Sequence, residues 1–198
     1  MGIHKFWGSS NSDMGSRFKV EDDGLTVSFS ALQDSADADI ICLRADHPLP
    51  PRPFPPDDPK SVYFEMKIFE TETQTDPDSK DSDLLPPELA IGLRGEFSDQ
   101  SGAHVGWRTW TVGYHGDDGR VYEHNYPVSS DTGRKFGPGD TVGCGVDYSA
   151  EEYFFALRSE VIARRKNNII SRKMYPTVSQ WRTACKIKVN FGDEHFLY

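Results

Sequence analysis

Long apolar stretches are missing from this sequence. No run approaches the roughly 20 apolar residues that a membrane-spanning helix requires. The segment Met1–Trp7 is followed by Gly, Ser, Asn and Asp, so the apolar core of a secretory signal is missing as well. We therefore expect a protein without a membrane contact, located in the cytoplasm or the nucleus.

Cysteine is scarce. The three cysteines, Cys42, Cys144 and Cys185, are odd in number, far apart, and each lies in a strand-like stretch. A disulfide framework needs an even set of closely spaced cysteines, so this pattern predicts reduced, buried thiols in an intracellular protein. One disulfide among the three is the alternative.

Motifs for catalysis and metal binding are also missing. The six histidines form neither a His-Glu-x-x-His motif nor a paired Cys–His spacing, and the sequence has no Gly-x-Ser-x-Gly elbow or phosphate-binding loop. The adjacent acids Asp117 and Asp118 are candidates for a carboxylate pair or for calcium ligands. They lie in a Gly-Asp-Asp-Gly sequence without EF-hand spacing, which favours a turn. We expect no metal, no cofactor and no enzymatic activity.

Positive charge is in the minority, with 22 Lys and Arg against 31 Asp and Glu and a net charge of -9. Such a surface disfavours binding to nucleic acid or to anionic membranes. The cations are nevertheless concentrated, because residues 158–188 contain nine Lys or Arg and one acid, Glu160. The segment Arg158–Lys173 is predicted to form a solvated hairpin, with a charge-complementary protein contact as the alternative.

Helical periodicity does not extend beyond about two turns anywhere, whereas period-two alternation is frequent. In Lys186–Phe191, for example, Ile187, Val189 and Phe191 share one face. Such segments alternate with turn sequences rich in Gly and Asp, which predicts an all-β fold, an antiparallel β-sandwich of about a dozen strands with little helix. The predicted strands are 17–20, 25–29, 40–44, 62–68, 89–93, 111–114, 120–123, 141–147, 153–157, 161–163, 175–179 and 186–191.

The chain is predicted to contain one domain. Residues 1–16 are polar and rich in Gly and Ser, which predicts a flexible leader before a domain over residues 17–198. Within that domain, residues 47–58 contain six prolines and should be extended and stiff. Residues 70–87 carry six acids against one lysine and predict a mobile acidic loop.

Eight short motifs occur in the order typical of one family, over nearly the whole of residues 17–198. Through them the sequence resembles the SPRY domain, which adopts a concanavalin A-like β-sandwich, and is closest in motif pattern to the type found in Ran-binding protein M. The segment Phe154–Glu160 departs from the family because it lacks the glycine of the usual hairpin. The motifs are Leu43–Pro50, Tyr63–Ile68, Ala90–Leu93, Gly106-Trp107, Val112–Gly119, Gly139–Asp147, Tyr175–Val178 and Val189–Gly192.

The resemblance implies a protein–protein interaction module, monomeric as an isolated domain. It would bind another protein or an extended peptide through loops at one end of the sandwich. It would act in substrate recruitment to a ubiquitin ligase or in scaffolding. A lectin-like, carbohydrate-binding sandwich is the alternative, and a hydrolase with two facing carboxylates comes third.

The resemblance also places the partner contact on a proline loop and two tryptophans. Prolines and aromatic rings on stiff loops bury area at small entropic cost. For both tryptophans, packing in the core is the alternative. Asp46 stands where peptide-binding relatives carry Arg, so their acidic peptide would meet a like charge. We expect the proline loop and both tryptophans to surround one pocket. The predicted contact residues are Asp46, His47, Pro48, Pro50, Trp107 and Trp181.

Overall fold

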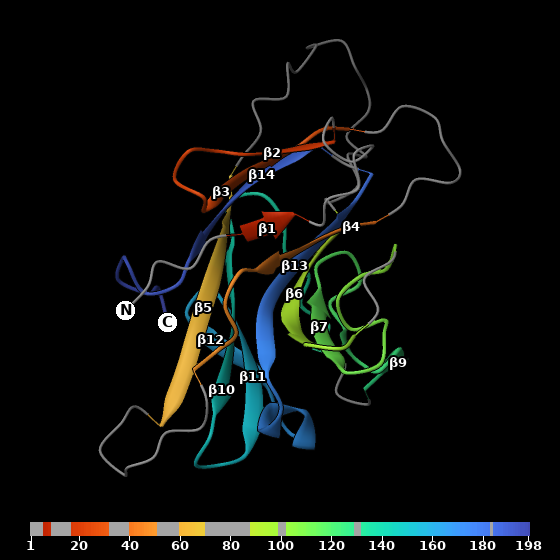
Figure 1. The fold of residues 1–198 in the computed structure, drawn as a ribbon, viewed down its shortest axis with the longest axis vertical. Helices are drawn as coiled ribbons and strands as arrows, with labels where there is room; N and C mark the ends of the chain where they lie inside the picture. The colour runs from red at the N-terminus through yellow and green to blue at the C-terminus, as the bar shows by residue number, and fades with distance from the viewer. Residues whose placement is uncertain are drawn as a thin grey trace.

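Two antiparallel β-sheets lie face to face in the computed structural model (Figure 1). The structure describes residues 6–8, 17–31, 40–50, 60–69, 88–98, 102–128, 132–182 and 184–198. The first sheet contains, in spatial order, β1 (Phe6–Gly8), β4 (Ile41–Ala45), β13 (Met174–Trp181), β6 (Glu88–Gly95), β7 (Thr111–His115), β8 (Val121–Glu123) and β9 (Tyr126–Pro127). The second contains β12 (Glu160–Lys166), β11 (Glu152–Leu157), β10 (Thr141–Asp147), β5 (Ser61–Ile68), β14 (Cys185–Asn190), β3 (Thr26–Phe29) and β2 (Phe18–Val20). These are called sheet A and sheet B.

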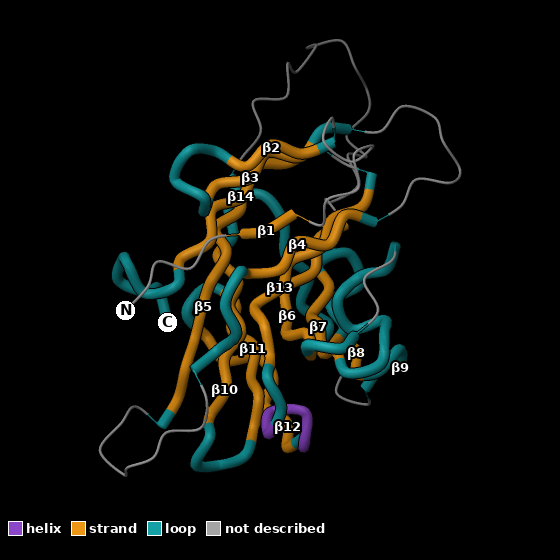
Figure 2. The backbone as a smooth tube through the Cα atoms, in the orientation of Figure 1, coloured by secondary structure: helices purple, strands orange, loops and turns teal. Residues whose placement is uncertain are grey.

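The predicted antiparallel sandwich is confirmed. All twelve predicted strands form, with ends that differ by a few residues, whereas β1 and β9 are not predicted from the sequence. Among the described residues, the only helical turn is the short 3-10 helix η1 (Asn168–Ser171), which stands out against the strands and loops in Figure 2. No helix in this part of the chain is long and apolar enough to cross a membrane.

One continuous core lies between the sheets. Alternate residues of β4 are buried, as expected for a strand with one face toward the core. Large rings fill the centre, since Phe64, Tyr114, Tyr153 and Phe155 are each at most 1% exposed. Aromatic side chains of this size bury 150–250 Å² each, so these four contribute strongly to the stability of the sandwich.

The three cysteines are unpaired, in agreement with the prediction of free thiols. Cys144 and Cys185 are buried, and Cys42 is half-buried on β4. Burial raises the pKa of the Cys185 thiol to about 12 and that of Cys144 well above its usual range. Both buried thiols are therefore protonated at neutral pH and behave as small apolar side chains.

The hairpin between β11 and β12 forms without glycine. Its two central residues, Arg158 and Ser159, both have positive φ, 51° and 68°. This is the conformation of a type I′ turn, which Asn-Gly usually occupies. Arg158 Nε lies 2.5 Å from Asp140 Oδ1, and this ion pair holds the turn against the neighbouring loop. The lack of glycine therefore does not prevent the hairpin.

Aromatic rings cover the outer face of sheet B. Tyr63 on β5 and Phe154 on β11 stack with their centroids 5.9 Å apart. They lie over Gly143 and Gly145 of the intervening β10, where a Cβ would come within 1.9 Å of the Tyr63 hydroxyl and 2.3 Å of the Phe154 ring, respectively. The rings can lie flat on the strand because these positions carry no side chain. Tyr198 closes over them, 5.3 Å from Tyr63 and 5.6 Å from Phe154.

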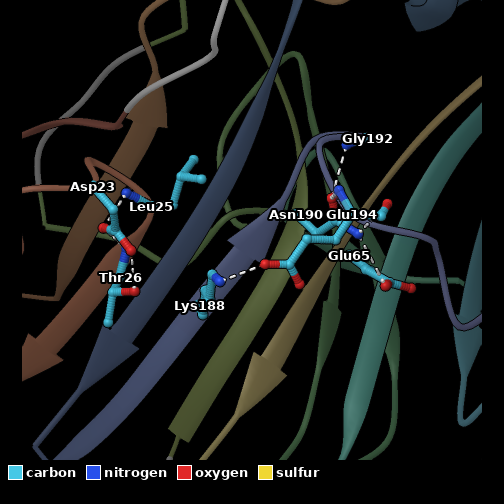
Figure 3. Close-up of polar contacts among 8 residues, drawn as sticks. All are labelled: Asp23, Leu25, Thr26, Glu65, Lys188, Asn190, Gly192 and Glu194. Atoms are coloured by element: carbon cyan, nitrogen blue, oxygen red, sulfur yellow. Dashed lines mark hydrogen bonds and ion pairs between the residues drawn. The ribbon is translucent and has the colours of Figure 1, made fainter.

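The buried carboxylate of Glu65, which lies beside Asn190 in Figure 3, holds the C-terminal segment in this place. Glu65 is 6% exposed, and both of its oxygens accept a hydrogen bond from the backbone N–H of Leu197 at 3.1 Å. Asn190 Nδ2 donates to the same carboxylate at 3.4 Å. The Asn190 Oδ1 in turn accepts from the backbone N–H groups of Gly192 and Glu194, which shapes the turn that leads to the segment.

Glu65→Gln should lower the free energy of unfolding by about 1–2 kcal/mol, because the buried acceptor loses its charge and an amide N–H can face the Leu197 N–H. Urea denaturation measures the change. Glu194→Gln is the control, since the Glu194 carboxylate is 63% exposed and its ion pair with Lys188 is worth less than about 1 kcal/mol. Equal losses for the two variants would contradict the anchoring role of Glu65.

Two connections that the sequence singled out fall on parts of the chain that the structure does not describe. The predicted mobile acidic loop, residues 70–87, and residues 51–58 of the connection predicted to be extended and stiff lie outside the described residues. Of the predicted leader, the structure describes Phe6–Gly8, which form β1 and pair with β4.

Candidate functional site

A pocket of about 700 Å³ opens where β10 ends and β13 begins, beside η1. Three distant parts of the chain form its walls. They are residues 48–50 of the loop after β4, the end of β10 with the following turn (Val146, Tyr148 and Glu151), and residues 166–168 and 170–174. The volume is that of sites which bury a ligand or a few residues of a peptide.

Two hydrogen bonds hold the proline loop against the sandwich. The backbone N–H of Leu49 donates to the carbonyl oxygen of Met174 at 2.7 Å, and the Tyr148 hydroxyl donates to the carbonyl oxygen of Pro50. Burial raises the pKa of Tyr148 to about 12, so the hydroxyl keeps its proton at neutral pH. Since the rings of Pro48 and Pro50 restrict the backbone further, this wall is rigid before any partner arrives.

The opposite wall is built on η1. Asn167 caps the turn, because its side chain accepts a hydrogen bond from the backbone N–H of Ile169 at 2.9 Å. Ile169 and Ile170 are 0% and 8% exposed and draw this segment into the core. The flanking Lys166 and Arg172 stay exposed as a result.

The rim of the pocket is positively charged. Lys166, Arg172 and Lys173 line it together with one acid, Glu151, which leaves two positive charges on a chain whose net charge is -9. The pocket therefore combines an apolar interior with a cationic edge. The formal charge of the residues that line this edge is opposite in sign to the net charge of the chain.

Contacts with neighbouring loops position two of these cations. The Arg172 guanidinium lies 3.6 Å above the Trp110 ring, and Lys173 Nζ lies 3.0 Å from Glu96 Oε1. The backbone N–H of Glu96 also donates to the carbonyl of Lys173. The next residue, Phe97, is 88% exposed, so an apolar ring projects into solvent near the cationic rim.

A second cluster lies on the outer face of sheet A, where the loop before β7 folds onto the strands. His104 Nδ1 and Ser179 Oγ share a hydrogen bond of 2.9 Å, and His115 Nε2–H donates to the Val105 carbonyl at 2.8 Å. Trp107 packs on both imidazoles, with centroid distances of 5.0 and 5.4 Å. Burial lowers the pKa of both histidines, that of His104 to about 3, so both rings are neutral at pH 7.

The predicted proline-loop residues lie at the pocket or next to it. Pro48 and Pro50 line the pocket. Asp46 and His47 precede them without lining it, and Asp46 Oδ1 lies 2.8 Å from His47 Nδ1. The like charge that Asp46 would present to an acidic peptide is therefore outside the pocket.

The predicted tryptophans lie elsewhere. Trp181 is the last residue of β13 and Met174, at the pocket, is the first, so seven strand steps separate them by about 23 Å. Trp107 packs on His104, which bonds to Ser179, two residues before Trp181. The expectation that both tryptophans and the proline loop surround one pocket is wrong, because the antiparallel pairing of β4 with β13 places them toward opposite ends of β13. Both tryptophans are half-buried, and their contact with a partner stays a prediction.

Residues 166–174 are the part of the pocket that the sequence did not assign to a site. The predicted hairpin is present, since β12 pairs with β11, but the chain then turns back through η1 to the pocket. The adjacent apolar residues Ile169 and Ile170 in an otherwise polar and basic stretch are the signal in the sequence that this segment is anchored in the core.

Asp118, one of the two adjacent acids considered as a carboxylate pair, stabilises a local turn. Asp118 Oδ1 accepts a hydrogen bond from the backbone N–H of Arg120 at 2.9 Å, and Asp118 Oδ2 accepts one from the Tyr122 hydroxyl at 2.6 Å. These contacts are those of a turn, as predicted. Among the described residues, no group of three or more His, Cys, Asp and Glu is placed to hold a metal ion.

Two packed antiparallel sheets with a loop-lined pocket at one end define a β-sandwich domain. A sequence model of the SPRY domain matches residues 82–194. The chain therefore belongs to the SPRY domain family, as its motifs predict. The SPRY fold is a protein-interaction fold and is not generally catalytic, so this domain is classed as a protein-interaction module.

The similar curated proteins include several Ran-binding proteins. The Ran-binding protein M homolog of Arabidopsis thaliana is 32% identical over 160 residues, which cover 81% of this chain and 30% of that protein. Ran-binding protein 9 of Homo sapiens is 29% identical over 164 residues, which cover 81% of this chain and 19% of that protein. The chain thus spans less than a third of the length of these relatives, and the resemblance to the Ran-binding protein M type is confirmed.

Solved SPRY domains share the fold. A crystal structure of a human SPRY domain matches 90% of this chain and 99% of its own chain, with a TM-score of 0.65 and 22% sequence identity. The SPRY domain of human HERC1 matches 91% and 98% with a TM-score of 0.61 and 14% identity. At these identities the likeness shows the fold alone.

Proposed function

We propose that this SPRY domain binds an extended segment of a partner protein in the pocket between the proline loop and η1. The observation that carries the proposal is the pocket itself, about 700 Å³ and lined by three parts of the chain at one end of the sandwich. Hydrogen bonds of Leu49 and Tyr148 hold one wall, and the buried Ile169 and Ile170 hold the other. A rigid pocket of this kind favours binding because little conformational entropy is lost.

The two rival functions receive less support. A lectin of this shape would use an open sheet face, but the loop that carries Trp107 covers the outer face of sheet A and Tyr198 packs on that of sheet B. A hydrolase would need two carboxylates facing each other across a cleft, and Glu151 is the single acid that lines the pocket.

We propose that, in the cell, binding of the partner segment in the pocket recruits the partner either to a ubiquitin ligase or to a scaffold. This would take place in the cytoplasm or the nucleus. The unpaired cysteines support a reducing compartment. We propose that the domain acts as a monomer.

A site-specific photo-crosslinker tests the proposed site. With benzoylphenylalanine in place of Ser171, which lines the pocket and is exposed, irradiation in a cell extract should yield a crosslinked partner. The same group in place of the exposed Lys186, which does not line the pocket, should not yield it.

Competition by domain variants without the crosslinker then tests whether the partner binds at the pocket. Excess wild-type domain should suppress the crosslink, whereas Asn168→Trp, which places a large ring at the rim, should compete at least about tenfold less well. Lys135→Trp, on an exposed residue that does not line the pocket, should compete as well as the wild type. If Asn168→Trp competes like the wild type, the partner binds elsewhere and the tryptophan face of sheet A becomes the next candidate.

A further inference from the structure

We infer that the segment bound in this pocket is acidic and inserts one apolar side chain between its carboxylates. The inference rests on the proposed function and names the chemistry of the partner. Two features of the pocket carry it. Its interior is apolar, and its rim bears three cations and one acid.

The interior is suited to a single large apolar side chain. Val146, Ile170 and Met174 line it and are themselves 1%, 8% and 2% exposed, so they belong to the core and cannot move away. Leu49 and Tyr148 complete the apolar surface. A side chain that enters this space loses contact with water at a gain of about 25 cal/mol per Å² of apolar area, which makes it the anchor of the interaction.

The rim is suited to carboxylates on either side of that anchor. Lys166, Arg172 and Lys173 come from one short stretch of chain, and all three are exposed. Arg172 is stacked on Trp110, which leaves the guanidinium edge available to a carboxylate. In an extended segment successive side chains point to opposite sides, so carboxylates next to the anchor point toward the rim while the anchor points inward.

The charge on the rest of the molecule also favours binding of an acidic partner at the pocket. The net charge of the chain is -9, and the pocket contributes two positive charges, so the remainder repels an acidic segment. An acidic partner is therefore directed to this edge of the domain. The attraction raises the association rate and makes binding sensitive to salt.

Selection from a random-peptide phage library identifies which peptides the pocket binds. On the wild-type domain we expect enrichment of peptides with net negative charge and with Leu, Ile, Met or Phe between acids. The double variant Lys166→Glu, Arg172→Glu should bind the selected peptides at least about tenfold more weakly in fluorescence anisotropy. Both positions are exposed, so this variant should fold normally. The matched control Lys135→Glu, Lys186→Glu changes the same charge away from the pocket and should bind like the wild type.

The peptides themselves provide the second test. Replacing the apolar anchor with Ala, or all acids with Asn and Gln, should each weaken binding by about tenfold or more. Enrichment of neutral or basic peptides, an unchanged affinity in the charge-reversed variant, or an oligonucleotide that competes as well as the anchored peptide would overturn the inference. If the crosslink at Ser171 persists while the charge-reversed variant binds normally, the pocket still binds a partner and only its acidic character is wrong.

Discussion

Replacing Gly113 with alanine should lower the free energy of unfolding by about 3 kcal/mol or more. Gly113 lies on β7 beneath the loop that carries Trp107, and a Cβ there would come 2.0 Å from the carbonyl oxygen of Val105. The loop would have to lift off the strand, and it would lose three buried hydrogen bonds, each worth about 1 kcal/mol. These bonds join His115 to the Val105 carbonyl, the Val105 N–H to Ser179, and the Gly106 N–H to Thr111.

Urea denaturation, monitored by tryptophan fluorescence, measures this loss. Unfolding removes Trp107 from the two imidazoles on which it packs and so changes its fluorescence. Gly95→Ala is the control on the neighbouring β6. Its nearest neighbour, the Trp110 Cβ, would be 3.1 Å away, so a shift of a few tenths of an ångström in Trp110 relieves that contact. We expect a loss of about 1 kcal/mol there, from the tight contact. A loss at Gly113 no greater than the loss at Gly95 would show that the loop does not depend on this close approach.

Acidification from pH 7 to pH 5 should destabilise the domain through His104 by about 2 kcal/mol. Burial, followed by the proximity of His115, lowers the folded-state pKa of His104 to about 3, whereas the unfolded value is about 6.5. Between these values the unfolded chain binds a proton that the folded chain does not, so stability falls as the pH falls through this window. The pKa of His115 is also lowered by burial and adds to the effect in the same direction.

His104→Gln isolates this term, because the amide can still bond to Ser179 but does not titrate. The free energy of unfolding of this variant, measured in urea at several pH values, should fall by about 2 kcal/mol less than that of the wild type between pH 7 and pH 5. His195→Gln, at an exposed position, should leave the pH dependence unchanged. If the wild type and His104→Gln lose the same stability over this range, His104 is not held neutral in the fold.

The candidate site was only partly accessible to sequence reasoning. Pro48 and Pro50 stood out because prolines at such density make a stiff loop, and both line the pocket. Asp46 and His47 came with them but do not line it. The basic segment stood out by its charge, yet nothing in its composition places it against a loop that lies more than one hundred residues earlier. The distribution of charge along a chain does not indicate which distant segment forms the opposite wall of a pocket.

The tryptophans illustrate the same limit. Gly106-Trp107 and Ser179-Gln-Trp181 were grouped with the proline loop through family resemblance, which orders motifs along the chain. Their distance from that loop depends on which end of β13 each one occupies, and this follows from the register of β13 with β4. Register is set by the packing of the whole sheet, so it lies beyond what a single segment can specify.

By itself, the sequence determined the class of fold. Period-two alternation and turn residues act locally, because a strand with one buried face must place every second side chain inward. For this reason the twelve predicted strands form and the sandwich follows. The tertiary structure alone decided where the pocket lies. It brought Pro48, Tyr148 and Ile170 to one pocket and kept Trp181 at the far end of β13. That arrangement depends on contacts between segments roughly one hundred residues apart, and no local pattern encodes such contacts.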